Sequence, residues 1–309
     1  MDAVAHARRP AHARRRATVP LPAATVAGLV LLAVGLLCAT APFALMAVNT
    51  FGESSQVAAH AQAVAGVPDV DAGREWQQAQ EYNRRLFEEG SDVLGDVTDP
   101  WSDGERSIAD RDRAYQDALD LPSDGIMASV RYPSLGIDLP IRHGTTAKVL
   151  AAGAGHLYGT SLPVGGTNTH AVISAHTGYD RLMFDRLSLG QGHVGDRFTI
   201  EVLGHTLAYR VTDIRVIDPD DFSVFGIEAG KDEVSLLTCT PYGVNTRRLV
   251  VTGERVDIPD PAPASDDVPL ARPGWWLLAA VGVVWLAFAV FVVLMIRARR
   301  RGNDGEQAA

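Results

Sequence analysis

Cysteine is scarce in this chain of 309 residues, which contains only two. Cys38 lies inside a long uncharged apolar run, so Cys239 is the one cysteine that the sequence places in an aqueous compartment. A lone thiol cannot form a disulfide within its domain, and it cannot build a zinc site from spaced cysteines. The shortage of cysteine therefore leaves Cys239 as a candidate nucleophile.

Positive charge is scarce in the segment between the two apolar runs. Residues 49–274 carry 19 lysines and arginines against 34 aspartates and glutamates, which gives a net charge of −15. Nucleic-acid binding needs a basic face, so this balance argues against nucleic acid as a partner. The chain lacks the spaced Cys or His pairs of a zinc site, and we predict no metal and no other cofactor. The acidic loops leave calcium as an open alternative.

Two apolar runs, residues 21–48 and 274–296, are each long enough to cross a bilayer core of about 30 Å as a helix. Arginine clusters before the first run and after the second predict that residues 1–20 and 297–309 are basic cytoplasmic tails. Both termini are then cytoplasmic and the segment between the runs is extracytoplasmic, with residues 258–273 as a linker. The alternative for the first run is a signal peptide cleaved after Ala41, although Pro42 disfavours that cleavage.

The hydrophobic period changes between the apolar runs. Residues 49–124 follow a helical pattern, with helices predicted over Ala72–Glu89 and Glu105–Leu119 on either side of an acidic loop. Within residues 125–257 the period is two, interrupted by a glycine-rich turn around His156 and a brief helix at Arg181–Leu187. The predicted strands are Ile126–Tyr132, Ile137–Ile141, Ala171–Ala175, Arg197–Leu203, His205–Ile217, Glu233–Cys239 and Leu249–Val256. This pattern indicates a mainly β fold, a closed or nearly closed antiparallel β-barrel.

The thiol of Cys239 needs a neighbouring base or cation, because an unperturbed cysteine has a pKa of about 8.5 and is mostly protonated at neutral pH. His176 is the first candidate, since it ends a predicted strand and precedes a loop, where a side chain is rigidly held and accessible. The alternative is a structural histidine at a strand end. His143 and His170 are secondary candidates that fit structural roles better.

Acyl transfer to a thiol also needs a donor for the negative charge that develops on the carbonyl oxygen. Arg247 and Arg248 follow Cys239 closely enough to supply it. Adjacent side chains of a strand point to opposite faces, so only one of the two arginines can face the cysteine. The residues alone leave this choice open, and a solvated surface charge is the alternative for either.

The run Thr238-Cys-Thr-Pro-Tyr-Gly-Val-Asn-Thr-Arg-Arg-Leu resembles the active-site signature of sortases, the bacterial cysteine transpeptidases, and in particular of the pilus-assembling class C. Three further blocks resemble that class in the expected order: His143-Gly-Thr-Thr, Ala154-Gly-His-Leu-Tyr-Gly-Thr-Ser-Leu-Pro-Val-Gly-Gly and Thr169-His-Ala-Val-Ile-Ser-Ala-His. The similarity covers residues 72–256.

This resemblance implies an eight-stranded sortase β-barrel over residues 125–257, in which Cys239 is the nucleophile, His176 the general acid or base and Arg248 the group that meets the oxyanion. Arg247 stands where the family usually has histidine, which keeps it a secondary candidate. Asp99 and Trp101 resemble the lid motif of class C, an acid followed by proline and an aromatic residue. The helical segment 49–124 would then carry the lid.

The implied reaction cleaves an LPxTG-like sorting signal between Thr and Gly and transfers the acyl group to a lysine amine of a pilin subunit. The expected partners are pilin or other LPxTG-bearing surface proteins, an amine acceptor and the membrane. One alternative is a housekeeping sortase that uses a cell-wall amine. Others are a hydrolytic cysteine peptidase and a non-catalytic membrane-bound scaffold.

Overall fold

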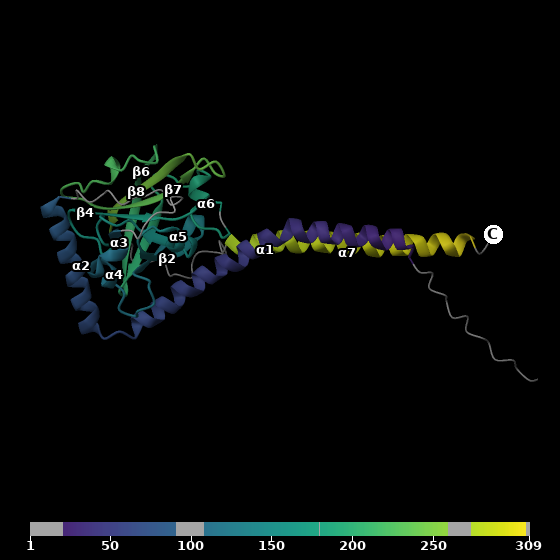
Figure 1. Ribbon diagram of the computed structural model, residues 1–309, viewed down its shortest axis with the longest axis horizontal. Helices are drawn as coiled ribbons and strands as arrows, with labels where there is room; N and C mark the ends of the chain where they lie inside the picture. Colours follow the sequence, from purple (N-terminus) through teal and green to yellow (C-terminus); the bar gives the residue numbers. More distant parts are fainter. Residues whose placement is uncertain (1–20, 91–107, 179, 259–272, 307–309) are drawn as a thin grey trace, which may run out of the picture. The chain divides into compact units, whose positions relative to one another are not determined.

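The computed structural model describes residues 21–90, 108–178, 180–258 and 273–306, and eight strands within these ranges form a closed barrel (Figure 1). In chain order the strands are β1 (Ala128–Tyr132), β2 (Ile137–His143), β3 (Ala154–His156), β4 (Thr169–Ser174), β5 (Arg197–Val202), β6 (His205–Ile217), β7 (Asp232–Thr240) and β8 (Arg247–Val256). Around the barrel their order is β1-β2-β3-β4-β7-β8-β6-β5. The predicted eight-stranded barrel is confirmed.

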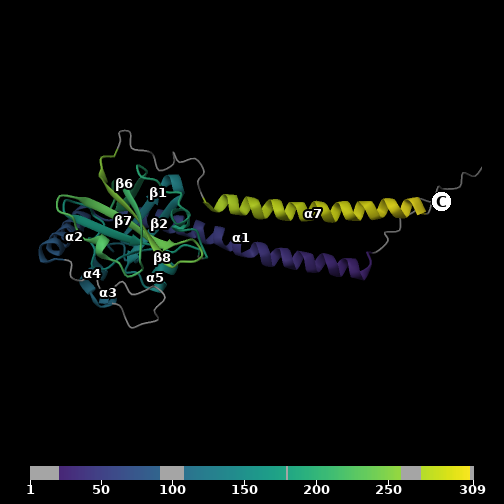
Figure 2. The same cartoon turned by 90° about the horizontal axis from the view of Figure 1, so that it is seen from above.

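The helices of the described residues are α1 (Ala23–Ala65), α2 (Asp69–Glu89), α3 (Ile108–Arg111), α4 (Arg113–Asp117), α5 (Ala147–Ala151), α6 (Asp185–Ser188) and α7 (Pro273–Glu306). Figure 2 shows the barrel from above with α2, α3, α4 and α5 beside it. Two short 3-10 helices span Pro133–Leu135 and Ser223–Phe225.

Two helices of the described chain, α1 and α7, contain stretches that are long and apolar enough to cross a membrane, and they indicate membrane association. Among the described residues, those up to Ala41 belong to one compact unit and those from Pro42 onward to a second. α1 continues beyond the apolar residues 21–48 through a polar stretch that contains no proline, and it ends at Ala65. Its last turns therefore belong to the second unit.

The strand pairing differs from the predicted antiparallel barrel in two places. Among the described strands, β2 and β3 are parallel, and so are β4 and β7. β3 itself was expected to be a turn, because three residues are too short to show a period of two. A Cβ at Gly155 would lie 2.2 Å from the carbonyl oxygen of Gly144, so the close approach of these segments requires glycine at this position.

The helical segments near the barrel are shorter than predicted. Glu105–Leu119 was expected to be one helix, but the described part forms α3 and α4, separated at Asp112. Asp112 is extended and its carboxylate accepts a hydrogen bond from Tyr115 N at 3.1 Å, so it caps the second helix and ends continuity with the first. The helix predicted at Arg181–Leu187 is confined to α6.

The barrel interior is filled by large side chains. Phe198 on β5 and Tyr209 on β6 are fully buried and stack with their ring centroids 5.6 Å apart. Gly253 on β8 faces this pair, and a Cβ there would lie 2.6 Å from the Phe198 ring. Full burial of one such ring stabilises the fold by about 1.5–3 kcal/mol. This packing fixes the frame from which the strand ends project.

A buried polar cluster fastens α4 to the barrel. The hydroxyl oxygen of Tyr115 lies 2.9 Å from Nδ1 of His156 and accepts a hydrogen bond from Gly144 N at 2.9 Å. Nε2 of His156 lies 2.8 Å from the carbonyl oxygen of Ser161, and Nε2 of His143 lies 2.7 Å from that of Ala118. Burial lowers the pKa of His143 and lowers that of His156 to about 4.

These buried histidines predict that acid destabilises the protein. Below pH 6.5 these histidines are protonated in the unfolded chain but stay neutral in the folded one. The free energy of unfolding therefore falls as the pH drops from 6.5 toward 4. Above pH 6.5 these rings do not change it. For His156 alone the loss amounts to about 3 kcal/mol, since one pKa unit corresponds to about 1.4 kcal/mol. We expect a lower denaturant midpoint at about pH 5 than at about pH 7.5. An equal or higher midpoint at about pH 5 would contradict this.

Candidate active site

Cys239 and Arg248 face each other across two neighbouring strands. In the antiparallel pairing of β7 with β8, Cys239 is the direct partner of Arg248. Directly opposite residues have side chains on the same face with their Cβ atoms about 5 Å apart, so the arginine lies beside the thiol. Cys239 is 7% exposed and Arg248 8%, which places both at the rim of the core.

Arg247 is directed away from the cysteine. Its partner on β7 is Thr240, so its side chain lies on the opposite face of the strand from that of Arg248. It is exposed and forms an ion pair with Asp218. The guanidinium of Arg248 instead donates to the carbonyl oxygens of Asn245 and Arg247, at 3.3 and 3.2 Å. The structure therefore brings one of the two predicted arginines to Cys239, and it is Arg248.

His176 lies just beyond the end of β4, which runs parallel to β7. The last paired residues are Ser174 and Leu237, and Ala175 N donates to the carbonyl oxygen of Leu237 at 3.1 Å. Thr238 Oγ1 then donates to the carbonyl oxygen of Ala175 at 2.9 Å. Continuing the register of Ser174 with Leu237 by two residues brings His176 beside Cys239. The loop after β4 and the adjacent strands β7 and β8 therefore place the histidine, cysteine and arginine at one end of the barrel.

The ring of His176 is nearly removed from water, with 8% of the residue exposed. Burial lowers its pKa, and the carboxylate of Asp180 partly opposes this effect. The uncharged ring is therefore favoured around neutral pH. A neutral imidazole can accept a proton from a thiol, which is the property that a general base next to a cysteine needs.

The short helix α6 connects the cysteine strand to the loop that follows His176. Ser188 Oγ donates to the carbonyl oxygen of Cys239 at 2.8 Å. Asp185, at the start of the same helix, accepts hydrogen bonds from Gly178 N at 2.9 Å and from Met183 N at 2.8 Å. These contacts hold the histidine loop and the cysteine backbone on one rigid element. Sequence reasoning missed them, since Ser188 and Cys239 are 51 residues apart.

The secondary candidates lie elsewhere in the barrel. His143 is on β2, which β3 and β4 separate from β7. Three strand spacings put β2 about 14 Å from β7 across the sheet. His170 pairs with Glu233, six residues before Cys239 and about 20 Å along the strand. Nε2 of His170 lies 2.8 Å from Ser235 Oγ. Both histidines are buried in hydrogen-bonded sites, and the structure does not bring them to the cysteine. The predicted lid residues, Asp99 and Trp101, lie outside the described residues.

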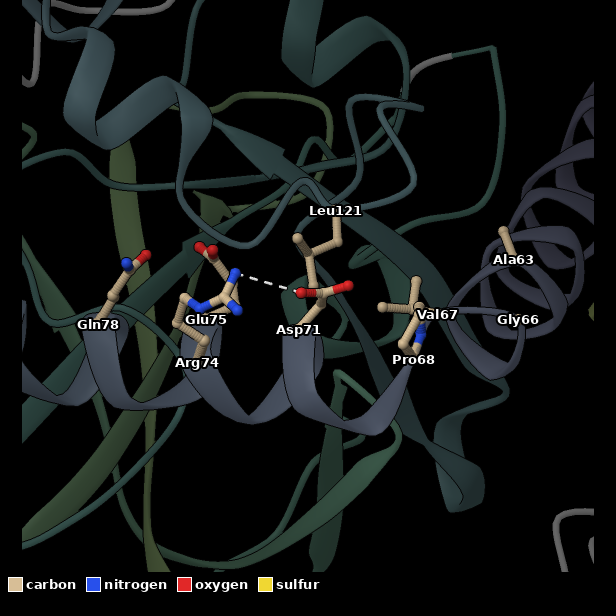
Figure 3. Close-up of a pocket in the computed structure, with 9 residues that line it drawn as sticks. All are labelled: Ala63, Gly66, Val67, Pro68, Asp71, Arg74, Glu75, Gln78 and Leu121. Atoms are coloured by element: carbon tan, nitrogen blue, oxygen red, sulfur yellow. Dashed lines mark ion pairs between the residues drawn. The ribbon is translucent and has the colours of Figure 1, made fainter.

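Two cavities of the described chain lie away from these three side chains. One, of about 490 Å³, lies where α1 turns into α2 and contains the ion pair of Asp71 with Arg74 (Figure 3). The other, of about 620 Å³, is bordered by His170, Lys231 and Glu233. No group of three or more His, Cys, Asp or Glu side chains in the described part of the chain is arranged to hold a metal ion.

A model of the sortase domain family matches residues 130–256. Sortase D of Bacillus subtilis (strain 168) is 28% identical over 149 residues, which cover 47% of this chain and 72% of that protein. Sortase A of Bacillus anthracis is 28% identical over 132 residues, covering 42% of this chain and 60% of that one.

Solved structures give stronger matches. Sortase C-1 from Actinomyces oris is 43% identical, with a TM-score of 0.53 and coverage of 60% of this chain and 99% of that chain. Sortase C-1 from Streptococcus pneumoniae is 38% identical, with a TM-score of 0.57 and coverage of 66% and 98%. The pilus-related sortase C of Group B Streptococcus is 38% identical, with a TM-score of 0.56 and coverage of 63% and 94%.

Proposed function

This chain belongs to the sortase family, and we propose that it is a pilus-assembling transpeptidase that uses Cys239, His176 and Arg248. Sortases act on LPxTG-type surface proteins and amine acceptors, so the transpeptidase activity follows from the family. The observation that carries the pilus assignment is the identity of 38% to a pilus-related sortase C, of which this chain covers 94%. The proposed acceptor is a lysine amine of a pilin subunit.

In the first half of the proposed reaction, the thiolate of Cys239 attacks the threonine carbonyl carbon of the sorting signal. Negative charge develops on the carbonyl oxygen, where the guanidinium of Arg248 stabilises it. The bond between threonine and glycine then breaks, and the departing amine takes a proton from His176, which had accepted the thiol proton. The product is a thioester on Cys239.

In the second half, the pilin lysine amine attacks the thioester and loses a proton to His176. The carbon–sulfur bond breaks, an isopeptide bond forms, and Cys239 leaves as thiolate. Water is a competing nucleophile at the same thioester, so productive transfer depends on an acceptor amine positioned at the site. The burial of Cys239 and His176 limits the approach of solvent.

The proposed orientation places residues 49–273 outside the cell, where surface-protein substrates are found. The support comes from the arginines that precede the first apolar run and follow the second. The domain division at residues 1–20, 21–48, 49–124, 125–257, 258–273, 274–296 and 297–309 is part of the same proposal. A reporter that works only in the cytoplasm should be active when fused to either terminus, and a reporter that works only outside the cell should be inactive at both.

Polymerisation of a pilin tests the proposed acceptor. We expect a ladder of SDS-resistant, isopeptide-linked polymers when the full-length chain is expressed with a pilin that carries an LPxTG-like signal and an acceptor lysine. Replacing that lysine by arginine should abolish the ladder without preventing cleavage of the signal. If the wild-type chain instead links single copies of the substrate to peptidoglycan, the acceptor is a cell-wall amine and the pilus assignment is wrong.

The two adjacent arginines provide a matched test of the site. We expect Arg248→Met to lower kcat about 100-fold, the typical loss when one donor to a developing oxyanion is removed. Arg247→Met should leave kcat within about threefold of wild type, because its charge is exposed and paired with Asp218. Peptide cleavage kinetics on both variants checks this. A larger loss in Arg247→Met than in Arg248→Met would reverse the assignment.

A further inference from the structure

The part of α1 beyond the apolar run contacts the loop that begins at His176. We call residues 176–178 and 180–185 the histidine loop. Asn49 Nδ2 donates to the carbonyl oxygen of Asp180 at 3.0 Å and to its carboxylate at 3.2 Å. Leu182 N donates to Thr50 Oγ1 at 3.1 Å. The helix therefore holds the loop by both backbone and side-chain groups.

A further contact is an ion pair between Glu53 on α1 and Arg181 of the histidine loop, and Arg181 also pairs with Asp180 at 2.9 Å. Glu53 is 1% exposed, and a Cβ at Gly153 would lie 3.1 Å from its second carboxylate oxygen, so the side chain is inserted between the barrel and the loop. A buried carboxylate is strongly destabilising without its cation. Glu53 therefore helps to fix the position of Arg181, together with Asp180.

The helix residues that make these contacts form one face. Glu53 stands four residues after Asn49 and three after Thr50, so its side chain neighbours both of theirs on the surface of the helix. A fourth residue, Gln56, accepts a hydrogen bond from Nη2 of Arg142 on β2 at 2.6 Å. The face is thus bound both to the barrel wall and to the histidine loop.

Hydrogen bonds within the histidine loop couple the position of its middle residues to that of His176. Phe184 N donates to the carbonyl oxygen of His176 at 3.2 Å, and the carboxylate of Asp185 ties the loop together through Gly178 N and Met183 N. The carboxylate of Asp180 also acts electrostatically on the His176 ring. The loop is compact, so it transmits a shift at Arg181 to the ring.

We propose that the Asn49–Glu53 face of α1 is a positioning element that holds the histidine loop, through Asp180, Arg181 and Leu182, in the conformation in which His176 meets Cys239. This inference rests on the proposed catalytic role of His176. None of the three helix residues touches the reacting atoms in this account; they act through the loop. Residues 49–53 of α1 and the histidine loop then act as one mechanical unit.

The test uses the full-length protein in detergent micelles and a fluorogenic peptide carrying an LPxTG signal. We expect Arg181→Met to lower kcat by about 10- to 100-fold with KM within about twofold, because misplacing a catalytic group by about 1 Å costs up to about 100-fold in rate. Arg181→Lys should recover part of the loss. Arg84→Met is the matched control, since Arg84 pairs with Glu81 and Glu88 on the exposed face of α2, and it should keep wild-type kcat.

Thermal unfolding of each variant separates positioning from loss of the fold. If Arg181→Met fails to fold, Asn49→Ala decides, because it removes only exposed hydrogen bonds; we expect its kcat to fall about threefold or more. Wild-type kcat in whichever of the two variants folds overturns the proposal. The proposal is also overturned if Arg181→Lys recovers none of the kcat lost in Arg181→Met and the loss of kcat across the variants follows their melting temperatures.

A third variant distinguishes failure of this inference from failure of the proposed function. An inactive His176→Ala together with wild-type kcat in Arg181→Met overturns only the positioning role of α1. A fully active His176→Ala overturns the catalytic assignment of His176 and the positioning role with it.

Discussion

Replacing Cys239 with alanine is expected to abolish isopeptide formation, with a loss in rate of about 10⁴-fold or more. Removal of the nucleophile leaves neither a thioester nor a second route to the amine, and knock-outs of catalytic nucleophiles in covalent enzymes reach about 10⁶-fold. The fold should survive, because the substitution removes one small side chain at the rim of the core, where Cys239 is 7% exposed. The measurement is the rate at which an LPxTG peptide is joined to a lysine amine.

Cys38→Ala is the matched control for this prediction. Cys38 is exposed and lies in the apolar part of α1, so its loss should leave the rate unchanged. Equal activity of Cys239→Ala and wild type would mean that the reaction does not pass through this thiol. If Cys38→Ala lost activity and Cys239→Ala kept it, the nucleophile would be Cys38 and the assignment to Cys239 would be wrong.

His176→Ala is expected to lower kcat/KM by about 10³-fold, within the range of about 10²- to 10⁴-fold that a positioned acid or base contributes. In the active form of the enzyme, the thiol of Cys239 and the ring of His176 hold one proton between them. A second proton inactivates it, so wild-type activity should fall as the pH drops through a value below 6.5, because burial lowers the pKa of His176. The variant should lack this acidic limb.

The control for the histidine is His193→Ala, whose ring is 75% exposed in the loop before β5. It should retain both the wild-type rate and the wild-type pH profile. An acidic limb that persists in His176→Ala would assign that ionisation to another group. A limb that disappears in His193→Ala would have the same consequence.

Much of the fold could be predicted from local patterns. Alternation of apolar and polar residues identified β1, β2 and β4 to β8 within a few residues, since a half-buried strand has a period of two. The apolar runs identified α1 and α7 as the two helices of the described chain that are long and apolar enough to cross a membrane. The closed barrel followed from the number of strands and the brevity of the helices between them.

Strand pairing could not be predicted in the same way. The parallel pairing of β4 with β7 joins segments about sixty residues apart, and no local period records which strands become neighbours. That pairing is what brings His176 toward Cys239. β3 contributes only three residues, and it was hidden in a glycine-rich run that is typical of turns.

The choice between Arg247 and Arg248 shows the same limit at the site. Alternation along a strand predicted that one arginine would face the cysteine, but the register of β7 with β8 was needed to say which. The contacts from Ser188 to Cys239 and from Glu53 to Arg181 have no sequence signature at all. They depend on the completed packing of distant segments.

The most direct test of the account is the mass of the full-length protein after it has reacted with an LPxTG peptide and been quenched in acid. The account predicts an adduct equal to the peptide up to its threonine, located on Cys239 by peptide mapping and released by hydroxylamine as a thioester should be. Peptide cleavage without an adduct on Cys239, or an equal adduct on the Cys239→Ala protein, would contradict it.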